Sequence, residues 1–203
     1  MASDVIIVGA GLAGLFLALK LAPRRVRVLA QAPLGEGSSS AWAQGGLAAA
    51  LAPEDAPELH ASDTLAAGAG LVDPAIARLI AGEGPARVMD LIALGVRFDR
   101  TPDGQLAQSL EAAHSRPRVV RVSGDLAGKA IMDWPISAAR AAGHIDMIEG
   151  VRAHTLLTDD QGAVRGVRCA KGADTVEFRA AEIVLATGGI GGLFEVTTNP
   201  RQA

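Results

Sequence analysis

The sequence contains a single cysteine, Cys169, so no disulfide can form within the chain. Cys169 lies in a run that reads as a strand, which favours a small core residue over a nucleophile. The only histidines are His60, His114, His144 and His154, and they lack the spacing of metal ligands, so we expect no metal site. Lysine and arginine are scattered, at a formal net charge of −3. This distribution gives no electrostatic footprint for nucleic acid or an anionic membrane.

A basic segment ahead of the first apolar run is also lacking. The stretch from Val5 to Leu21 is long and apolar, but three glycines at turn spacing interrupt it, which argues against a membrane span and a signal peptide. With 203 residues, 49% of them hydrophobic and 20% charged, the chain suits one globular domain with a buried core. We therefore expect a cytoplasmic protein.

The most informative feature present is the first glycine-rich turn. The apolar strand Val5–Val8 runs into Gly9-Ala10-Gly11-Leu12-Ala13-Gly14, and the helical run 15–21 follows. In a dinucleotide fingerprint the first glycine permits a tight turn, the second lets the backbone approach a pyrophosphate, and the third lets helix and strand pack closely. The pyrophosphate then lies at the positive end of the helix. An ordinary strand-turn-helix is the alternative.

The end of the second strand leaves the identity of the dinucleotide open. This strand covers 26–29 and continues into Ala30-Gln31, where a ribose-binding carboxylate is usually found. Gln31 can still hydrogen-bond a ribose hydroxyl, and the next acid, Glu36, falls in a loop. The motif alone therefore does not distinguish FAD from NAD.

The rest of the chain alternates helices, strands and turns. Residues 46–51 read as helix-like, 53–60 as a polar, proline-broken surface connection, and 74–95 as a helix that begins at Pro74. A hairpin is expected from 96–99 and 105–109, and a helix over 124–142 that Pro135 should kink or end. A strand over 145–148 precedes an antiparallel meander of 153–157, 163–169 and 175–178.

A second glycine-rich turn follows the last strand, 182–186, at Thr187-Gly188-Gly189. Strands with glycine turns at both ends of the chain, with helices and a small meander between them, predict an α/β fold. We expect a doubly wound, Rossmann-like sheet with a small antiparallel β meander as an insertion. Ligands of such sheets bind at the carboxyl ends of the strands, so both glycine turns should lie on the same rim.

Several further segments, in this order and spacing, resemble the L-aspartate oxidase family, FAD enzymes of the succinate dehydrogenase and fumarate reductase flavoprotein superfamily. The segments are Ser38-Ser39-Ser40-Ala41-Trp42-Ala43-Gln44-Gly45-Gly46, 60–71, Glu111-Ala112-Ala113-His114-Ser115-Arg116, 186–189 and 197–200. The resemblance implies one FAD-binding domain over residues 1–203, with the family's capping domain beyond Ala203 and absent here. It also implies that residues 1–203 alone are inactive.

The resemblance also implies which residues contact the cofactor. The first turn would hold the pyrophosphate of FAD, and the segment 38–46 would pass beside the ribityl chain and the isoalloxazine ring. Trp42 is expected to pack rather than stack on the flavin, and Gln44 either contacts a flavin edge or caps its own loop. The full cofactor-binding set is Gly9, Ala10, Gly11, Leu12, Ala13, Gly14, Gln31, Ser38, Ser39, Ser40, Ala43, Gln44, Gly45, Gly46, His154, Thr187 and Gly188.

Glu111 is the candidate catalytic residue, because the family's matching glutamate meets the substrate's ammonium group and so favours an amino acid over a plain dicarboxylate. A solvated loop acid is the alternative. His114, Ser115 and Arg116 either orient substrate or serve the structure. Ala112 and Ala113 replace glycines of the family's motif, and a Cβ there is strained where the backbone needs a positive φ.

The family's activity is the oxidation of L-aspartate to iminoaspartate for NAD biosynthesis, with oxygen or fumarate as the acceptor and a coupling to quinolinate synthase. The respiratory flavoproteins attach FAD covalently through a histidine in the segment that Ser38–Ser40 occupies here, so non-covalent FAD is implied. A soluble fumarate reductase-type flavoprotein and a non-catalytic FAD-binding fragment are the alternative functions.

Overall fold

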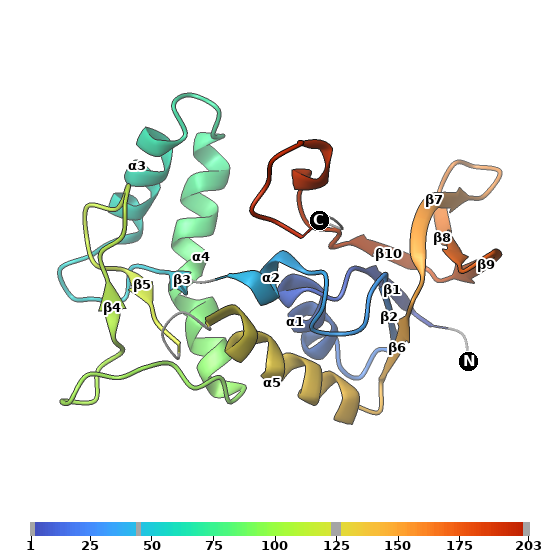
Figure 1. Ribbon diagram of the computed structural model, residues 1–203, viewed down its shortest axis with the longest axis horizontal. Coiled ribbons are helices and arrows are strands. Elements are labelled where there is room, and N and C mark those ends of the chain that lie inside the picture. Colours follow the sequence, from blue (N-terminus) through green and yellow to red (C-terminus); the bar gives the residue numbers. More distant parts are fainter. Residues whose placement is uncertain (1–2, 44–45, 123–126, 201–203) are drawn as a thin grey trace. The chain divides into compact units, whose positions relative to one another are not determined.

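The computed structural model describes residues 3–43, 46–122 and 127–200. The chain divides into two compact units (Figure 1). The first unit comprises Met1–Trp42 and Ile131–Ala203, and the second comprises Ala43–Ala130. Each unit is built around a sheet and helices of its own.

The first unit contains a four-stranded parallel sheet in the order β10-β1-β2-β6. Its strands are β1 (Val5–Val8), β2 (Val26–Ala30), β6 (Ile145–Glu149) and β10 (Glu182–Leu185). All four residues of β1 are buried, as expected for a central parallel strand that is covered on both faces. The predicted strands at 5–8, 26–29, 145–148 and 182–186 are therefore confirmed to within one residue at their ends.

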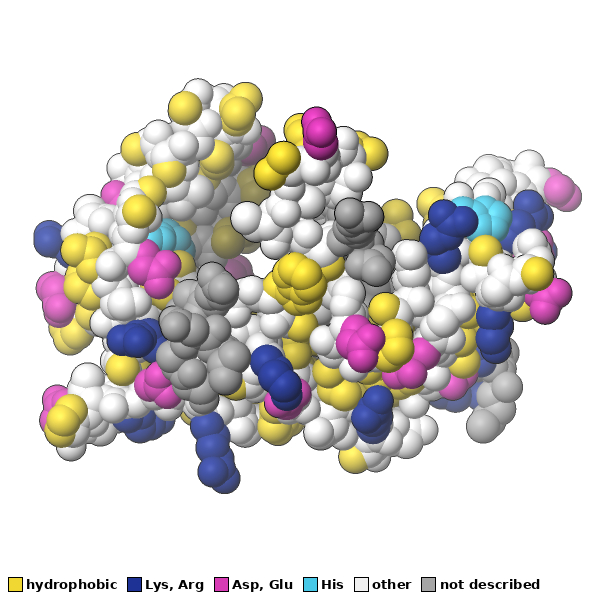
Figure 2. All heavy atoms as spheres, in the orientation of Figure 1, with side chains coloured by type: hydrophobic (Ala, Val, Ile, Leu, Met, Phe, Trp, Pro, Cys, Tyr) yellow, Lys and Arg dark blue, Asp and Glu magenta, His cyan; other side chains and the backbone are white. Residues whose placement is uncertain are grey.

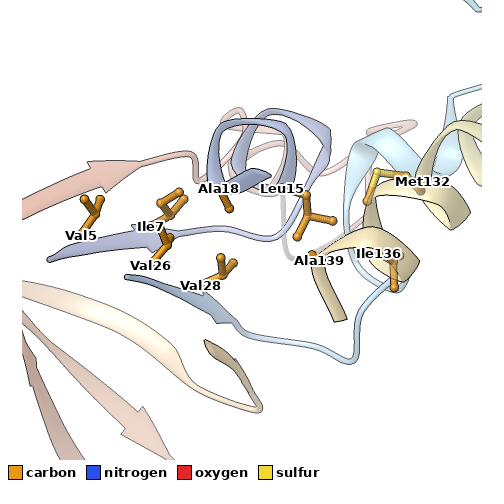
Figure 3. Close-up of a cluster of buried hydrophobic side chains, with 9 residues drawn as sticks. All are labelled: Val5, Ile7, Leu15, Ala18, Val26, Val28, Met132, Ile136 and Ala139. Carbon is orange, nitrogen blue, oxygen red and sulfur yellow. The ribbon is translucent and has the colours of Figure 1, made fainter. Parts of the chain in front are cut away.

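Two helices cover one face of this sheet. Helix α1 (Leu12–Lys20) and helix α5 (Ala127–Ala141) pack on the side chains of β1 and β2 that point toward them (Figure 3). The cluster consists of Val5, Ile7, Leu15, Ala18, Val26, Val28, Met132, Ile136 and Ala139. Because side chains of a strand alternate between the faces of its sheet, Val5 and Ile7 point to this layer and Ile6 and Val8 to the other.

The predicted meander covers the opposite face of the parallel sheet. It consists of β7 (Arg152–Thr158), β8 (Val164–Lys171) and β9 (Asp174–Arg179) in an antiparallel arrangement. Ile6 and Val8 pack there with Val167 and Cys169. The thiol of Cys169 is fully buried, and this burial raises its pKa, so the prediction of a core residue is confirmed. The α/β fold class is thereby confirmed.

The second unit combines two helices with a small antiparallel sheet. The helices are α3 (Pro57–Ala67) and α4 (Pro74–Ala93), and the strands are β3 (Leu47–Ala48), β4 (Gln108–Ser109) and β5 (Val119–Val120) in the order β3-β5-β4. Helix α4 begins as predicted, and the side chain of its N-cap residue Asp73 accepts hydrogen bonds from the backbone N–H groups of Ala75 and Ile76.

Two local expectations are wrong, and one of the two alternatives stated for Pro135 is excluded. Residues 46–51 contain strand β3 rather than a helix, because Leu47 and Ala48 pair with β5 and tertiary pairing overrides the helix propensity of alanine. Residues 53–60 are not a plain surface connection, since α3 begins at Pro57 and His60 is buried. Helix α5 does not end at Pro135 but continues to Ala141, because Met132, Ile136 and Ala139 all bury their side chains in one core.

The turn of the expected hairpin is present with shorter strands: an isolated bridge joins Arg100 to Leu106, and β4 starts at Gln108. Two short helices complete the first unit, α2 (Ser39–Trp42) and a 3-10 turn over Gly191–Leu193. On the face that Figure 2 shows, Lys and Arg side chains are dispersed among Asp and Glu side chains rather than gathered. Among the described helices, none has both the length and the apolar character that a membrane crossing requires.

Candidate functional site

The first glycine turn has the geometry that its sequence predicts. Gly9 adopts φ +114°, and its N–H donates to the carbonyl of Leu29 at the end of β2 (2.9 Å). A Cβ on Gly9 would overlap the carbonyl of Ala186, and a Cβ on Gly14 would overlap the carbonyl of Gly9. Glycine is therefore required at both positions, for the turn and for the close packing of α1 on β1.

Gly11 shows a different environment. It is the N-cap of α1 with an extended backbone, and no side chain of its own caps the helix. Instead the N–H of Leu12 donates to Oγ of Ser40, 3.2 Å away, and a Cβ on Gly11 would lie 3.3 Å from that same oxygen. The serine segment thus folds against the start of α1. The other N–H groups of the first turn have no partner within the helix, as at the start of any helix.

A pocket of about 480 Å³ opens at this end of the sheet, within the range of small-molecule and cofactor sites. It is lined by both glycine turns, which confirms that they share one rim. The predicted cofactor-binding residues that line it are Gly9, Ala10, Gly11, Leu12, Ala13, Gln31, Ser38, Ser39, Ser40, Thr187 and Gly188. Gly14 lies beneath the turn and is buried.

Among the lining residues that were not predicted, Glu36 is the acidic one. Glu36 lies in the loop after β2 and contributes to the wall of the pocket together with Gln31. Its backbone N–H donates to the carbonyl of Pro33 (2.9 Å), which forms a turn within the loop. The signal in the sequence is weak, an acid five residues after Gln31 in an irregular loop. The structure thus places an acidic residue at the pocket although no acid ends β2.

His154 does not line the pocket. Its side chain is exposed, and its Nδ1 lies 2.9 Å from Oγ1 of Thr155. The neighbouring Val151 and Ala153 line the pocket instead. Because successive side chains of a strand alternate between the faces of its sheet, His154 does not share the face of Val151 and Ala153.

The remaining predicted cofactor residues belong to the second unit or are not described. The carbonyl of Ala43 accepts the N–H of Gly128 (2.7 Å). Gly46 adopts φ +128°, and a Cβ there would overlap the carbonyl of Val120, so the pairing of β3 with β5 is itself a reason for glycine. Gln44 and Gly45 lie outside the described residues.

Glu111 lies in the loop that connects β4 to β5, and its side chain is exposed. Its carboxylate accepts a hydrogen bond from Oγ of Ser109 (3.4 Å), and its carbonyl accepts the N–H of His114 (3.2 Å). Within this turn Ala113 adopts φ +68°, whereas Ala112 does not have a positive φ. The strain that was expected where alanines replace glycines therefore falls on Ala113 alone.

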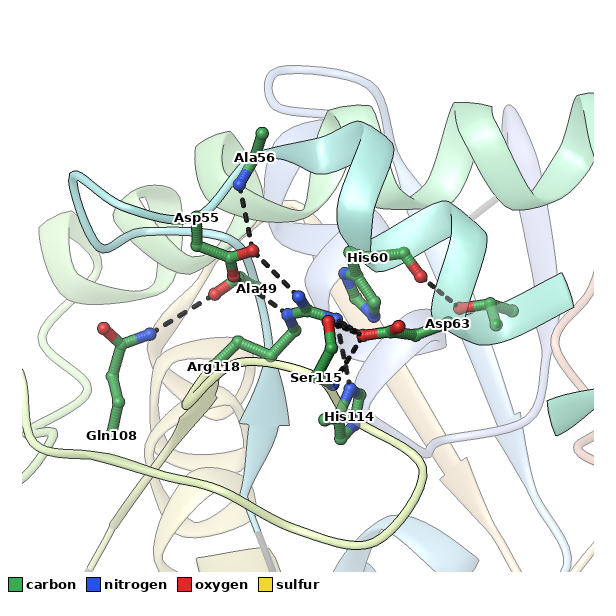
Figure 4. A network of polar contacts seen from close by, with 10 residues as sticks. Ala49, Asp55, Ala56, His60, Asp63, Gln108, His114, Ser115 and Arg118 are labelled. Atoms are coloured by element: carbon green, nitrogen blue, oxygen red, sulfur yellow. Dashed lines mark hydrogen bonds and ion pairs between the residues drawn. The ribbon is translucent and has the colours of Figure 1, made fainter. Parts of the chain in front are cut away.

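A buried ionic network that the sequence analysis missed supports this loop (Figure 4). The guanidinium of Arg118 is fully buried and donates to both oxygens of Asp55 (2.8 and 2.9 Å) and to Oδ2 of Asp63 (2.6 Å). Oδ2 of Asp63 also accepts the N–H and the Oγ–H of Ser115, at 2.7 and 2.8 Å. Two carboxylates thus share one buried cation, and each polar group of the guanidinium finds a partner in them.

These contacts shift the pKa values of the network. The hydrogen bond from the backbone N–H of Ser115, with those from Ser115 Oγ and Arg118, lowers the pKa of Asp63 to about 2. Burial opposes the ionisation of Asp55, yet its bonds to Arg118 and Ala56 keep its pKa below the ordinary value. The bonds to the two carboxylates raise the pKa of Arg118. The network is therefore ionised throughout the physiological pH range.

Two histidines flank this network. The rings of His60 and His114 have centroids 5.6 Å apart, and Nδ1 of His114 lies 3.4 Å from Nη1 of Arg118. Burial, with the positive charge of Arg118, lowers the pKa of His60, so His60 is neutral at pH 7. Among the described residues no group of three or more His, Cys, Asp or Glu side chains is placed to hold a metal ion.

Comparison with known proteins finds relatives that are L-aspartate oxidases. The chain is 53% identical over 200 residues to the L-aspartate oxidase of Caulobacter vibrioides, which covers 97% of this chain and 39% of the relative. It is 45% identical to the L-aspartate oxidase of Agrobacterium fabrum, over 96% of this chain and 37% of the relative. The resemblance stated above is thereby confirmed. The chain spans about two fifths of the length of these relatives.

Solved structures show the same fold. Sdh1 of Mycobacterium smegmatis superposes with a TM-score of 0.87 at 32% identity, over 98% of this chain and 36% of that chain. FrdA of the E. coli quinol fumarate reductase gives a TM-score of 0.86 at 26% identity, over 96% and 34%. The family model described as FAD binding domain matches residues 4–203. This match decides between FAD and NAD, and the chain belongs to the FAD binding domain family.

Proposed function

We propose that this chain is the FAD-binding portion of an L-aspartate oxidase, which oxidises L-aspartate to iminoaspartate for NAD biosynthesis and passes the electrons to oxygen or fumarate. One observation carries the proposal: the curated relatives at 53% and 45% identity are L-aspartate oxidases. An exposed carboxylate, Glu111, on an anchored loop is consistent with it. A cytoplasmic location and a coupling to quinolinate synthase stay predictions.

The pocket of the first unit fits FAD. The N–H groups at the start of α1 and the close backbone of Gly11 suit the pyrophosphate, while Gln31 and Glu36 suit the hydroxyls of the adenosine ribose. Ser40 accepts the N–H of Leu12 and so holds the serine segment beside the turn. Because this segment offers hydroxyls and no histidine, FAD binds without a covalent bond. The bound flavin supplies the hydride acceptor for the reaction.

Glu111 selects the substrate. Its carboxylate pairs with the ammonium group of L-aspartate, which fumarate lacks, and such a charge-assisted hydrogen bond is stronger than one between neutral groups. The related fumarate reductase FrdA makes a fumarate reductase-type flavoprotein the second candidate function. The acid at position 111 favours the amino acid, because an unpaired carboxylate facing a dicarboxylate is repulsive.

A chimera tests this function. Residues 4–203 replace the matching segment of the Caulobacter vibrioides relative, and the purified flavoprotein is assayed for peroxide formation with L-aspartate and for fumarate reduction. We expect oxidation of L-aspartate, lowered by Glu111→Gln about tenfold to a hundredfold with fumarate reduction spared, as a lost charge-assisted bond of roughly 1.5–3 kcal/mol implies.

Glu58→Gln is the matched control, because Glu58 is an exposed glutamate in the first turn of α3. It should leave both activities unchanged. A chimera that reduces fumarate but does not oxidise L-aspartate would support the second candidate function instead. Equal losses for both substrates in Glu111→Gln would identify Glu111 as a structural residue.

A further inference from the structure

We propose that Asp63 is a positioning residue that holds the Glu111 loop, residues 110–117, in the conformation that presents Glu111 to the substrate's ammonium group. The inference rests on the proposed function for the role of Glu111. The anchoring of the loop itself is independent of that function, and it follows from contacts within the second unit.

Between its two ends the loop is anchored through Ser115. At the ends, Ser109 and Val119 pair across β4 and β5, and the N–H of Arg118 donates to the carbonyl of Ser109 (3.2 Å). Between them, Ser115 gives both its N–H and its Oγ–H to the same oxygen of Asp63. Since Asp63 lies on α3, this contact joins the loop to a helix 52 residues earlier in the sequence.

Asp63 is itself held in place. Its Oδ2 also accepts Nη1 of Arg118, and the other face of that guanidinium is fixed by two hydrogen bonds to Asp55. The side chains of Asp55 and Arg118 are fully buried, and that of Asp63 is 18% exposed. A carboxylate locked in this way cannot follow a moving loop, so the loop takes its position from the carboxylate.

A tight turn connects the anchored Ser115 to Glu111 and so restrains the position of Glu111. The N–H of His114, next to Ser115, donates to the carbonyl of Glu111, and Ala113 between them adopts φ +68°. An alanine in the left-handed region persists only where the surroundings hold it there. Ser115 is bound to Asp63, and the adjacent His114 is bound to the carbonyl of Glu111. Loss of the contact between Ser115 and Asp63 therefore removes the constraint that keeps Glu111 in place.

Hydrogen exchange on the full 203-residue chain tests the anchor. Ser115→Ala removes the Oγ–H donor and leaves the Arg118–Asp55 pair intact, and Asp63→Asn removes the charge of the acceptor. We expect both variants to speed amide exchange in residues 110–117 by about threefold to tenfold and to leave β8 unchanged. Ser137→Ala is the matched control, because its Oγ donates to the carbonyl of Asp133 on α5, outside the loop. Unchanged exchange in the loop of Ser115→Ala would overturn the proposal.

Kinetics of the chimera test the consequence for Glu111. We expect Ser115→Ala to raise KM for L-aspartate about threefold to tenfold, with kcat within about twofold and KM for fumarate unchanged. In a double-mutant cycle, Ser115→Ala should add nothing to the KM of Glu111→Gln, because the serine acts through the glutamate. Additive effects on KM would overturn the positioning role.

The two proposals fail in different ways. If the unmodified chimera does not oxidise L-aspartate, the proposed function fails, and the exchange measurement still decides whether Asp63 anchors the loop. If the chimera is active but Ser115→Ala leaves KM for L-aspartate unchanged while loop exchange rises, the function stands and the positioning role is wrong.

Discussion

Gly9 and Ala186 directly follow the neighbouring parallel strands β1 and β10, so close together that a Cβ on Gly9 would overlap the carbonyl of Ala186. The glycine therefore serves the fold as well as the ligand: it lets β1 turn into α1 while β10 ends beside it. Gly11, two residues later, is not in such contact, since the nearest atom to its missing Cβ is the hydroxyl of Ser40. The two glycines of one motif thus have separable roles.

This difference predicts opposite behaviour for two substitutions. Gly9→Ala should lower the free energy of unfolding by about 2 kcal/mol or more, because overlap and a φ of +114° both oppose it. Gly11→Val should leave the unfolding of the apoprotein close to wild type and abolish FAD binding. Urea unfolding and flavin titration measure the two effects. Gly143→Ala, with no atom near its added Cβ, is the control. Stoichiometric flavin in Gly11→Val would contradict the assignment of the turn.

The flavin should dissociate. Because Ser38–Ser40 offer only hydroxyl groups where the respiratory flavoproteins carry a histidine, acid precipitation of the flavin-loaded chain should leave the yellow colour in the supernatant. The absorbance of supernatant and redissolved pellet measures the partition. Flavin that stays with the pellet would show a covalent bond.

Ala113 carries strain that a single substitution relieves. An alanine in the left-handed region destabilises the fold by about 1–2 kcal/mol. Glycine removes this strain, but the greater backbone entropy of glycine in the unfolded chain offsets roughly 0.5–1 kcal/mol of the gain. Ala113→Gly should therefore raise the free energy of unfolding by about 0.5–1 kcal/mol. Ala112→Gly, at a neighbouring position without a positive φ, should lower it slightly. Urea unfolding of both variants checks the contrast, and equal effects would refute it.

The low pKa of Asp63 predicts how stability depends on pH. The folded-state pKa, about 2, lies below the unfolded value near 4, so the ionised carboxylate stabilises the fold fully above about pH 4 and loses this contribution as the pH falls toward 2. Wild type should exceed Asp63→Asn in stability at pH 6, and the difference should shrink between about pH 4 and pH 2. Urea midpoints across that range measure it. A constant difference would exclude the ionised form as the cause.

Residues 1–203 alone should not oxidise L-aspartate, even with excess FAD. Hydride transfer requires the reacting atoms to be held about 3–3.5 Å apart, and the role proposed for Glu111 concerns only the ammonium end of the substrate. An oxygen-electrode assay on the purified chain measures turnover, with the active chimera as the positive control. Sustained turnover by the chain alone would contradict this prediction.

The parallel strands, the meander, helix α4 and the glycine turns could all be predicted from the amino-acid sequence. These features depend on local chemistry: apolar runs, the 3.6-residue period, and positions where only glycine fits, such as Gly9 and Gly14. Each of these signals lies within a short stretch of sequence, so it can be read without knowing which distant residues pack against that stretch. The first glycine turn predicted a dinucleotide, and FAD in particular was implied by the family resemblance, which the match to the FAD binding domain confirms.

Features that depend on residues far apart in sequence could not be predicted and are known from the folded structure. Asp55 was read as part of a surface connection, yet it is buried because Arg118, 63 residues later, meets it with two hydrogen bonds. Residues 47–48 became a strand because β5 offered partners. Glu36 lines the pocket from an irregular loop whose course the sequence does not indicate. Burial of charge and pairing of strands are set by the partner, and a partner distant in sequence leaves no periodic signal.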